Sequence, residues 1–450
     1  MLVHKNLNST LPTLKPSRQL KLQTALALLT LLPMQAGAFE QKLDLRFEAK
    51  VNYRDSQQAS FVTPPLPSFE PNTSTPILAT VEEGGNAEVS LISVAGKWQF
   101  ANSWQLNFKV DGVDLYDRNP TSTDNEIDID NFFLRCGNAS TATNIPTSNN
   151  YYVQLGKFKK FEQQRARRSE SYGLVSTAFN RFEDSGLEAG FDLPSGFYGR
   201  LSYTTGNPLF IRDVNALAGD NGTQSFQTPE DINQTPELNS GFPIFYDAEI
   251  EDFDLANDPE LGLGLGYRWN SRNRNQKLDV LAFHYQRDLS ETRDLSGSFF
   301  GGDLDLFQLS EIPGAEQIGL PFSGNEKTES GINLWYNYGD FAVFSQYVDQ
   351  DLAGLDRDGF EIELSYAFNW RINIVPVIRY SELNNNFSSP AGFSLPSLQW
   401  DWRKIDYAIN VDITDNLRLI VEYADNEIET ALGTIDQDEF LVTLRWQLNL

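Results

Sequence analysis

The sequence predicts an all-β fold: a transmembrane antiparallel up-and-down β-barrel of about 16 strands, with long external loops and short periplasmic turns. Three observations predict it. Apolar and polar residues alternate with period two in segment after segment, short and long connections follow each other, and aromatic residues gather near the ends of the alternating segments. A strand of a soluble sandwich also alternates, but the polar faces here carry more charge than a dry core accepts.

The first 38 residues are expected to be a secretory signal peptide. A basic lead precedes the apolar run "ALALLTLLP", and the run ends at the small residues "AGA", 36–38, typical of a cleavage site. The apolar run is shorter than the roughly 20 residues of a spanning helix. Residues 1–38 are therefore the predicted signal peptide, and residues 39–450 a single outer-membrane barrel domain.

Composition excludes several classes of function. The formal net charge is −27, which argues against a nucleic-acid partner because such binding depends on Lys and Arg neutralising phosphates. Cys136 is the only cysteine, and His284 is the only histidine after the signal segment. His284 lies in the alternating segment "LAFHYQRD" without a nearby serine, so we expect no catalytic residues, no metal site and no cofactor.

Strict alternation places the strands along the chain. The first segment, "KLDLRFEAKVNYR", puts Leu43 and its apolar partners on one face and the charged residues on the other. The last, "FLVTLRWQLNL", resembles the C-terminal signal of outer-membrane barrels, although it ends in Leu450 where Phe is usual. The predicted strands are 43–54, 86–98, 104–114, 126–135, 151–159, 186–193, 197–205, 261–269, 277–287, 330–338, 341–349, 359–370, 372–381, 402–413, 417–425 and 439–450.

Connection lengths set the predicted orientation of the barrel. Short turns are expected on the periplasmic side, at 101–103, 194–196, 339–340 and 414–416. Long external connections are expected at 55–85, 160–185, 206–260, 288–329 and 382–401. The segment 137–150 is long for a periplasmic turn, so strand numbers of about 14 to 18 stay open. A barrel of about 16 strands is wide enough for an aqueous channel.

The stretch "KFKKFEQQRARR", 157–168, places six basic residues directly after a predicted strand and opens the loop 160–185. If this loop folds inward, its bases form a constriction of the kind that selects anions. The alternative is a solvated loop whose bases pair with acidic neighbours or with lipopolysaccharide phosphates. The candidate constriction residues are Lys157, Lys159, Lys160, Arg165, Arg167 and Arg168. The candidate bases of the lumenal wall are Arg46, Lys50, Arg200, Arg379, Arg418 and Arg445.

Three further features bear on the lumen and the membrane interfaces. Gly262, Gly264 and Gly266 share the polar face of one strand, which suits either a docked loop or a bend in the sheet. The acidic loop 206–260 lacks an ordered Ca²⁺-binding motif and is expected to be an external surface; if it lies over the mouth, its negative field opposes anion entry. Aromatic girdles are expected at strand ends, from Tyr53, Trp104, Trp269, Tyr338, Trp370, Tyr380, Trp402 and Trp446.

A block of about 50 residues resembles a known family. "VQLGKFKKFEQQ", with Gly156 to Lys159, and "DSGLEAGF", with Asp184 and Gly186, are similar to the phosphate-selective porin O and P family of Gram-negative outer membranes. The resemblance implies a homotrimer and passive diffusion, often with anion preference. The chain departs from the family at Lys160–Glu162, where the family commonly continues with Pro-Phe-Gly.

These features lead us to expect a porin in the outer membrane of a Gram-negative bacterium. Its partners would be small hydrophilic solutes or anions, together with outer-membrane lipid and lipopolysaccharide. Two alternatives remain: a channel specific for oligosaccharides or another solute, and an outer-membrane hydrolase that depends on His284. A soluble sandwich adhesin is a third, weaker alternative.

Overall fold

The computed structural model describes residues 41–57, 59–62, 77–81, 84–114, 125–139, 144–179, 183–206, 209–210, 244–246, 259–288, 326–352, 354–385, 401–430 and 433–450. The predicted signal peptide, 1–38, lies outside the described residues. So does most of the acidic loop 206–260, and most of the connections 288–329 and 382–401.

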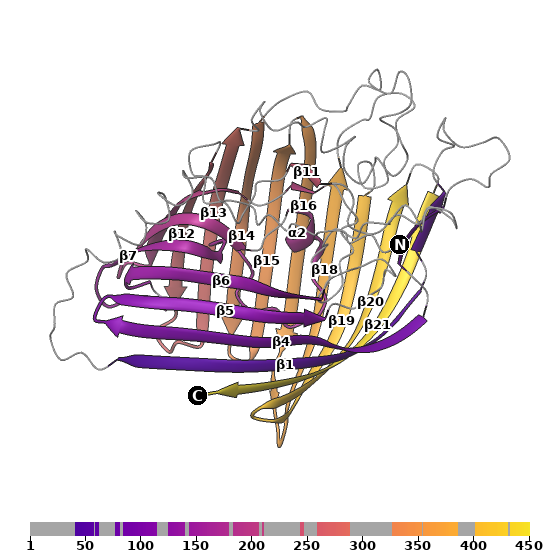
Figure 1. Ribbon diagram of the computed structural model, residues 1–450, viewed down its shortest axis with the longest axis horizontal. Helices are drawn as coiled ribbons and strands as arrows, with labels where there is room; N and C mark the ends of the chain where they lie inside the picture. Colours follow the sequence, from indigo (N-terminus) through magenta and orange to yellow (C-terminus); the bar gives the residue numbers. More distant parts are fainter. Residues whose placement is uncertain are drawn as a thin grey trace, which may run out of the picture.

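Within the described residues, 16 long strands form one closed antiparallel barrel (Figure 1). They are β1 (Lys42–Ser56), β4 (Gly84–Ala101), β5 (Trp104–Asp114), β6 (Asn125–Gly137), β7 (Asn150–Lys159), β8 (Glu183–Asp192), β9 (Phe197–Thr204), β12 (Glu260–Asn270), β13 (Gln276–Asp288), β14 (Glu326–Tyr338), β15 (Phe341–Leu352), β16 (Leu355–Tyr366), β18 (Asn373–Asn385), β19 (Asp401–Thr414), β20 (Leu417–Thr430) and β21 (Gly433–Asn449).

Short elements complete the described structure. A fragment β17 (Phe368–Asn369) pairs with the start of β18. Two small hairpins lie beyond the barrel sheet: β2 (Ala59–Val62) with β3 (Ile77–Val81), and β10 (Leu209–Phe210) with β11 (Ile244–Tyr246). One short helix, α2 (Leu174–Ala178), lies in the connection between β7 and β8. No helix in the described part of the chain is long and apolar enough to cross a membrane.

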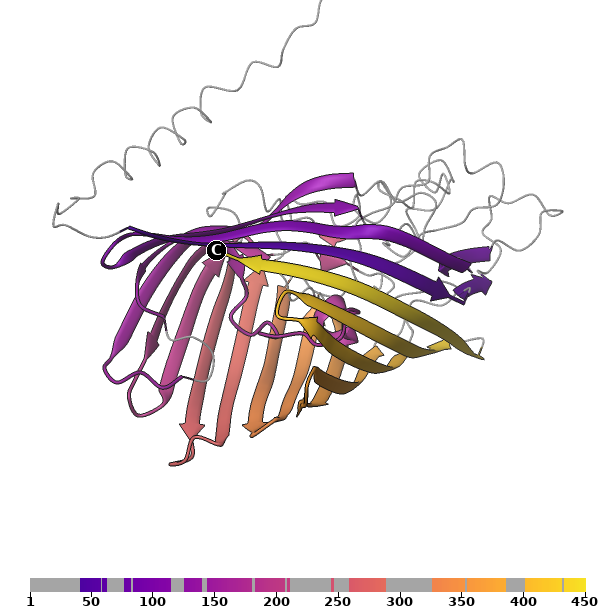
Figure 2. The same cartoon turned by 90° about the horizontal axis from the view of Figure 1, so that it is seen from below.

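The first and last strands close the barrel. Strand β1 pairs on one side with β4 and on the other with β21, where Ala49 lies opposite Trp446. Backbone hydrogen bonds join Leu45 and Leu450 in both directions, at 3.0 and 2.8 Å. In the described residues the barrel sheet therefore has no unpaired edge, which is the condition for strands to span lipid. Figure 2 shows the end of β21 beside the start of β1.

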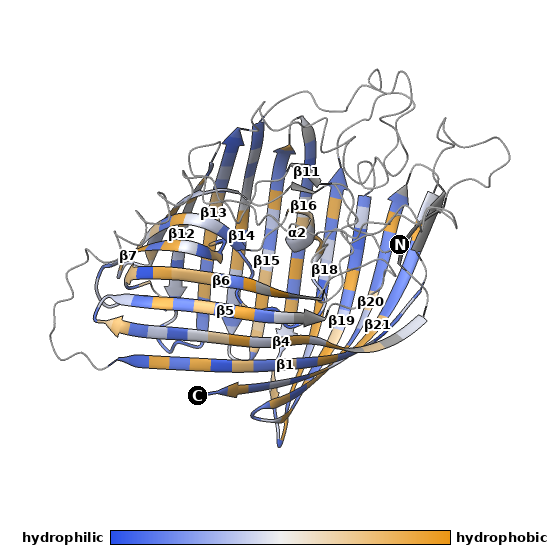
Figure 3. Cartoon of the chain, in the orientation of Figure 1, coloured by the Kyte–Doolittle hydropathy of each residue, from blue (hydrophilic) through white to orange (hydrophobic). Residues whose placement is uncertain are grey.

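The alternation that predicted the strands now defines two faces of the wall. On β12, Leu261, Leu263 and Leu265 point outward, and each is about half exposed. Their neighbours Gly262 and Gly264 face inward and are buried. Figure 3 shows the same alternation of apolar and polar residues along the other strands. An exposed apolar exterior around a polar interior is the pattern of a transmembrane barrel.

All 16 predicted strands are confirmed, with ends that differ by a few residues. The segment 137–150, long for a turn, still joins neighbouring antiparallel strands, because β6 pairs directly with β7. One aromatic assignment is wrong. Trp402 belongs to the inward row of β19 with Lys404 and Asp406, and only 2% of it is exposed, so it is not a girdle residue.

Candidate functional site

The connection after β7 runs through the interior of the barrel. Residues 160–179 leave the end of β7, follow the inward faces of β12 to β20, and include the helix α2. Figure 2 shows this magenta segment and α2 inside the ring of strands. We call residues 160–179 the inner loop. Its contacts with the wall fall into three groups, at its start, middle and tip.

The start of the inner loop is anchored by buried polar contacts. The Lys160 ammonium lies 2.5 Å from Glu260 of β12, and Lys327 of β14 shares the same carboxylate at 2.6 Å. Burial alone would lower the pKa of Lys160, but the nearby carboxylates, led by Glu260, outweigh burial and raise it. The Glu162 carboxylate accepts a hydrogen bond from Tyr285 at 2.5 Å, and the Glu162 carbonyl accepts one from Asn333 at 2.5 Å.

The middle of the inner loop uses arginines. The Arg165 guanidinium forms an ion pair with Asp279 of β13 at 2.7 Å and lies 3.9 Å from the ring centroid of Trp335. Arg168 lies 3.6 Å from Glu363 of β16. Both partners are buried carboxylates, so each contact replaces lost hydration with a charged partner.

The tip of the inner loop reaches the opposite wall. Glu170 forms an ion pair with Lys50 of β1 at 2.5 Å, and its backbone N–H donates to Glu422 of β20 at 2.6 Å. Ser171 donates to Asp406 at 3.0 Å and accepts from Arg379 at 2.9 Å. Burial alone would raise the pKa of Glu170, but Lys50 and then Arg167 outweigh burial and hold it below its usual value.

Glycines make room for the inner loop. A Cβ atom on Gly264 would lie 2.7 Å from the ring of Phe161, so the glycine at this position admits the loop. The expectation of a docked loop is thus borne out at Gly264, whereas the space at Gly262 and Gly266 is taken by side chains of neighbouring strands. A Cβ atom on Gly359 of β16 would similarly meet Phe179, beyond α2, at 2.6 Å.

The six candidate constriction residues are not equivalent. Lys160, Arg165 and Arg168 contact wall carboxylates as described, and Arg167 lies 3.7 Å from the ring centroid of Tyr172. Lys159 pairs with Glu183 at 3.4 Å. Lys157 differs: it lies within β7, opposite the outward-facing Phe132, in the row of exposed apolar residues.

The six candidate wall bases all lie in inward rows. Lys50 and Arg379 contact the tip of the inner loop. The other four are spread along the wall: Arg200 pairs with Asp192 at 2.9 Å, Arg418 with Asp412 at 2.5 Å, Arg46 with Glu48 at 3.7 Å, and Arg445 lines a cavity near the short turns.

The main residues that sequence reasoning missed are the wall carboxylates that receive the inner loop. They are Glu260, Asp279, Glu363, Asp406 and Glu422. Four of them are acidic residues in the polar rows of predicted strands, so the alternation identified the row. Glu260 was assigned to the acidic loop 206–260, one residue before the predicted strand 261–269. The alternation could not identify the partner, which lies about 100 to 250 residues away along the chain.

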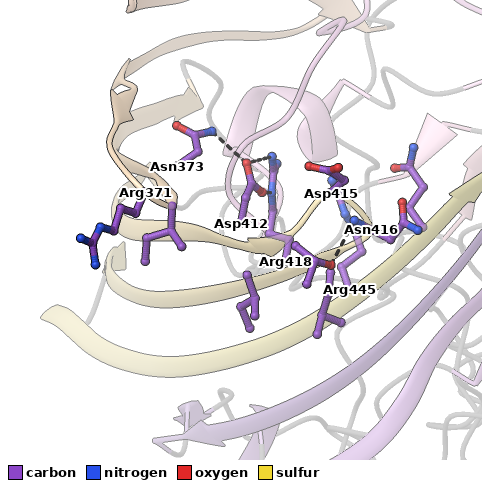
Figure 4. A pocket seen from close by; sticks show the side chains of 12 residues that line it. Arg371, Asn373, Asp412, Asp415, Asn416, Arg418 and Arg445 are labelled. Carbon is purple, nitrogen blue, oxygen red and sulfur yellow. Dashed lines mark hydrogen bonds and ion pairs between the residues drawn. The ribbon is translucent and has the colours of Figure 1, made fainter.

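Two cavities lie toward the end of the barrel that carries the short turns. One, of about 490 Å³, is lined by residues of β18 to β21 and the turns between them (Figure 4). In it Asn373 and Arg418 both contact Asp412, and Arg445 lies close by. The other, of about 770 Å³, lies against β1 and β4 to β7. No group of three or more metal-ligating side chains occurs among the residues described.

His284 faces outward from β13, and its Nδ1 lies 2.9 Å from the Ser330 hydroxyl of β14. No carboxylate orients the ring among the described residues. The neighbouring backbone is engaged in the strand ladder, since β13 pairs continuously with β12 and β14. Within the described residues, this pair therefore has neither an orienting acid nor free N–H donors of the kind that a hydrolase uses.

Comparisons with known proteins agree on the fold. No family model and no curated protein matches the chain. The solved outer-membrane channel DcaP of Acinetobacter baumannii is 7% identical, with a TM-score of 0.50 over 92% of this chain and 99% of that one. OprB of Pseudomonas putida is 8% identical, with a TM-score of 0.50 over 91% and 94%. An anion-selective porin from Comamonas acidovorans is 10% identical, with a TM-score of 0.46 over 91% and 100%. At such low identity, the first two likenesses show the transmembrane β-barrel fold.

Proposed function

We propose that this protein is an outer-membrane porin for the passive diffusion of small hydrophilic solutes. The observation that carries the proposal is the inner loop: residues 160–179 are held across the interior of a closed 16-stranded barrel. A barrel of this size leaves an aqueous channel unless something fills it. The inner loop narrows the channel, and its polar surface and the polar wall admit hydrated solutes.

We propose a modest preference for anions, with the constriction formed by Lys159, Lys160, Arg165, Arg167 and Arg168. Pairing with wall carboxylates neutralises much of this charge. About a quarter of the Arg165 side chain and a third of the Arg168 side chain remain exposed, at 26% and 32%. Partly exposed guanidinium groups beside a narrowed path attract anions, although less strongly than unpaired ones.

The protein would lie in the outer membrane of a Gram-negative bacterium, reached through the predicted signal peptide. The exposed apolar exterior of the wall supports a lipid environment. The resemblance to the phosphate-selective porins supports a homotrimer, which chemical cross-linking of the purified protein tests. Phosphate itself is one of the anions to be tried.

Swelling of proteoliposomes tests the proposal directly. Purified protein in liposomes should permit rapid swelling in isosmotic arabinose and slower swelling in the larger stachyose, because a narrowed pore sieves by size. Heat-denatured protein is the matched control. A folded protein that admits neither sugar and carries no current in a planar bilayer would refute the porin proposal. Selective swelling in one oligosaccharide alone would favour the substrate-specific channel.

A further inference from the structure

The positive charge of the lumen is not neutralised evenly. The inner loop lies against β12 to β20, where the loop bases meet carboxylates. The larger cavity, of about 770 Å³, lies on the other side, against β1 and β4 to β7. Five basic side chains line this cavity: Arg46, Lys97, Lys109, Arg135 and Lys159. Asp44 is the one acidic side chain of this lining, and it pairs with Lys42 at 3.1 Å.

These five bases differ in how far they are neutralised. Lys109 is held by Asp111 at 2.6 Å and by Asp130 at 3.1 Å, and Lys159 is held by Glu183. Arg46 has only a loose contact with Glu48, at 3.7 Å. For Lys97 and Arg135, no carboxylate lies within ion-pair distance in the part of the chain described. These two bases are therefore free of ion pairs within the described residues, although Asp44 lies across the ladder from Lys97 and Glu188 lies beyond Arg135 through Gln154.

Arg135 is held in place by direct contacts with neutral side chains. Its Nε and Nη2 atoms both donate to the Gln154 side-chain oxygen, at 2.9 and 2.6 Å, and Gln154 in turn donates to Glu188 at 3.2 Å. The guanidinium lies 5.1 Å from the ring centroids of both Phe133 and Tyr152. A guanidinium that neutral groups orient keeps its charge for a further partner, and loses little conformational entropy on binding one.

The same cavity has an aromatic part. Phe133 and Phe158 both line it, with ring centroids 6.2 Å apart in an edge-to-face arrangement. Apolar rings beside a few oriented polar groups are typical of sites that bind organic molecules, whereas a path for inorganic ions needs charge alone. Rings on the lumenal face of an otherwise polar wall therefore point to a solute with an apolar body.

We propose that this cavity is a binding subsite for organic anions with a flat apolar body, of which an aromatic carboxylate is the simplest. The carboxylate would bind Arg135 and Lys97, and the ring would pack on Phe133. The proposal deepens the proposed porin function and rests on it for the route by which the solute arrives. Binding itself requires only the folded barrel, so the two ideas can fail separately.

Calorimetry in detergent tests the subsite independently of conduction. The purified full-length protein is titrated with benzoate and with acetate, and benzoate should bind measurably more tightly. Lys97→Gln, at an exposed position, should weaken benzoate binding about tenfold, because a charge-assisted contact is lost. Phe133→Leu should reduce the advantage of benzoate over acetate. Arg272→Gln, on a turn outside the cavity, is the matched control and should change nothing.

Equal binding of benzoate and acetate, or benzoate binding unaffected by both Lys97→Gln and Arg135→Gln, would overturn the subsite. The variant Arg135→Lys keeps the positive charge and should retain part of the benzoate binding. If it does, the loss of binding in Arg135→Gln reflects the lost charge and not a folding defect. Benzoate that binds as predicted to a protein without channel activity would refute the porin proposal and leave the subsite standing. Channel activity without benzoate binding would refute the subsite and leave the porin proposal standing.

Discussion

The ammonium of Lys50 on β1 lies 2.5 Å from the carboxylate of Glu170, 120 residues further along the chain. This pair ties the tip of the inner loop to the wall at β1. Because both side chains are nearly buried, removal of one partner leaves an uncompensated charge, at a cost of about 3–5 kcal/mol.

Glu170→Gln should therefore release the loop tip. We expect faster hydrogen exchange at residues 168–173 and noisier single-channel currents, while strand amides far from the loop stay protected. The double variant Lys50→Met with Glu170→Leu is the control, since removing both charges should restore most of the protection. Unchanged exchange in the single variant would show that the other contacts hold the tip without this pair.

Acid should release the same contact. The pKa of Glu170 lies below its usual value because Lys50 and Arg167 outweigh burial. A carboxyl with a lowered pKa stabilises the docked loop above the usual value of about 4.3 and loses that contribution as pH falls through its lowered pKa. Current noise in the wild-type protein should thus be constant from pH 8 to about 5 and should rise below about 4. Noise that rises already near neutral pH would contradict this assignment.

A methyl group under the inner loop tests the fit at Gly264. Gly264→Ala would bring a Cβ to 2.7 Å from Phe161, so we expect a loss of about 1–3 kcal/mol in loop docking through overpacking. Gly112→Ala is the matched control, because its nearest neighbour lies at an ordinary 3.6 Å. Hydrogen exchange of residues 160–165 measures the difference. Equal protection in the two variants would mean that Phe161 moves aside freely.

Neutralising the exposed loop arginines should reduce anion preference. In a planar bilayer under a KCl gradient, Arg165→Gln with Arg168→Gln should shift the reversal potential toward the cation side. Glu363 loses its contact with Arg168 and adds to the shift, whereas Asp279 keeps its ion pair with Arg268 at 3.0 Å. Arg272→Gln, which changes a base on an exposed turn away from the inner loop, is the control and should leave the reversal potential unchanged. An identical potential in the double variant would place the selectivity elsewhere in the lumen.

Alternation with period two contains enough information to place every barrel strand, because the wall has only two faces and each meets a different solvent. Lys50 and Arg379, which it assigned to polar rows, are buried and contact the inner loop. The alternation could not predict which loop side chain contacts which wall side chain. Nothing local distinguishes Asp279, which receives Arg165, from other acids in the same rows. Trp402 was misassigned because aromatic residues near strand ends occur on both faces, and only the row parity separates them.

The central claim is that the inner loop narrows an aqueous channel. Single-channel conductance of a variant in which residues 163–178 are replaced by a short Gly-Ser linker tests it most directly. We predict a conductance at least about two-fold above that of the wild type, because the emptied barrel is wide enough to conduct freely. A folded variant with the wild-type conductance would contradict the claim, since the loop would then lie outside the path that limits the current.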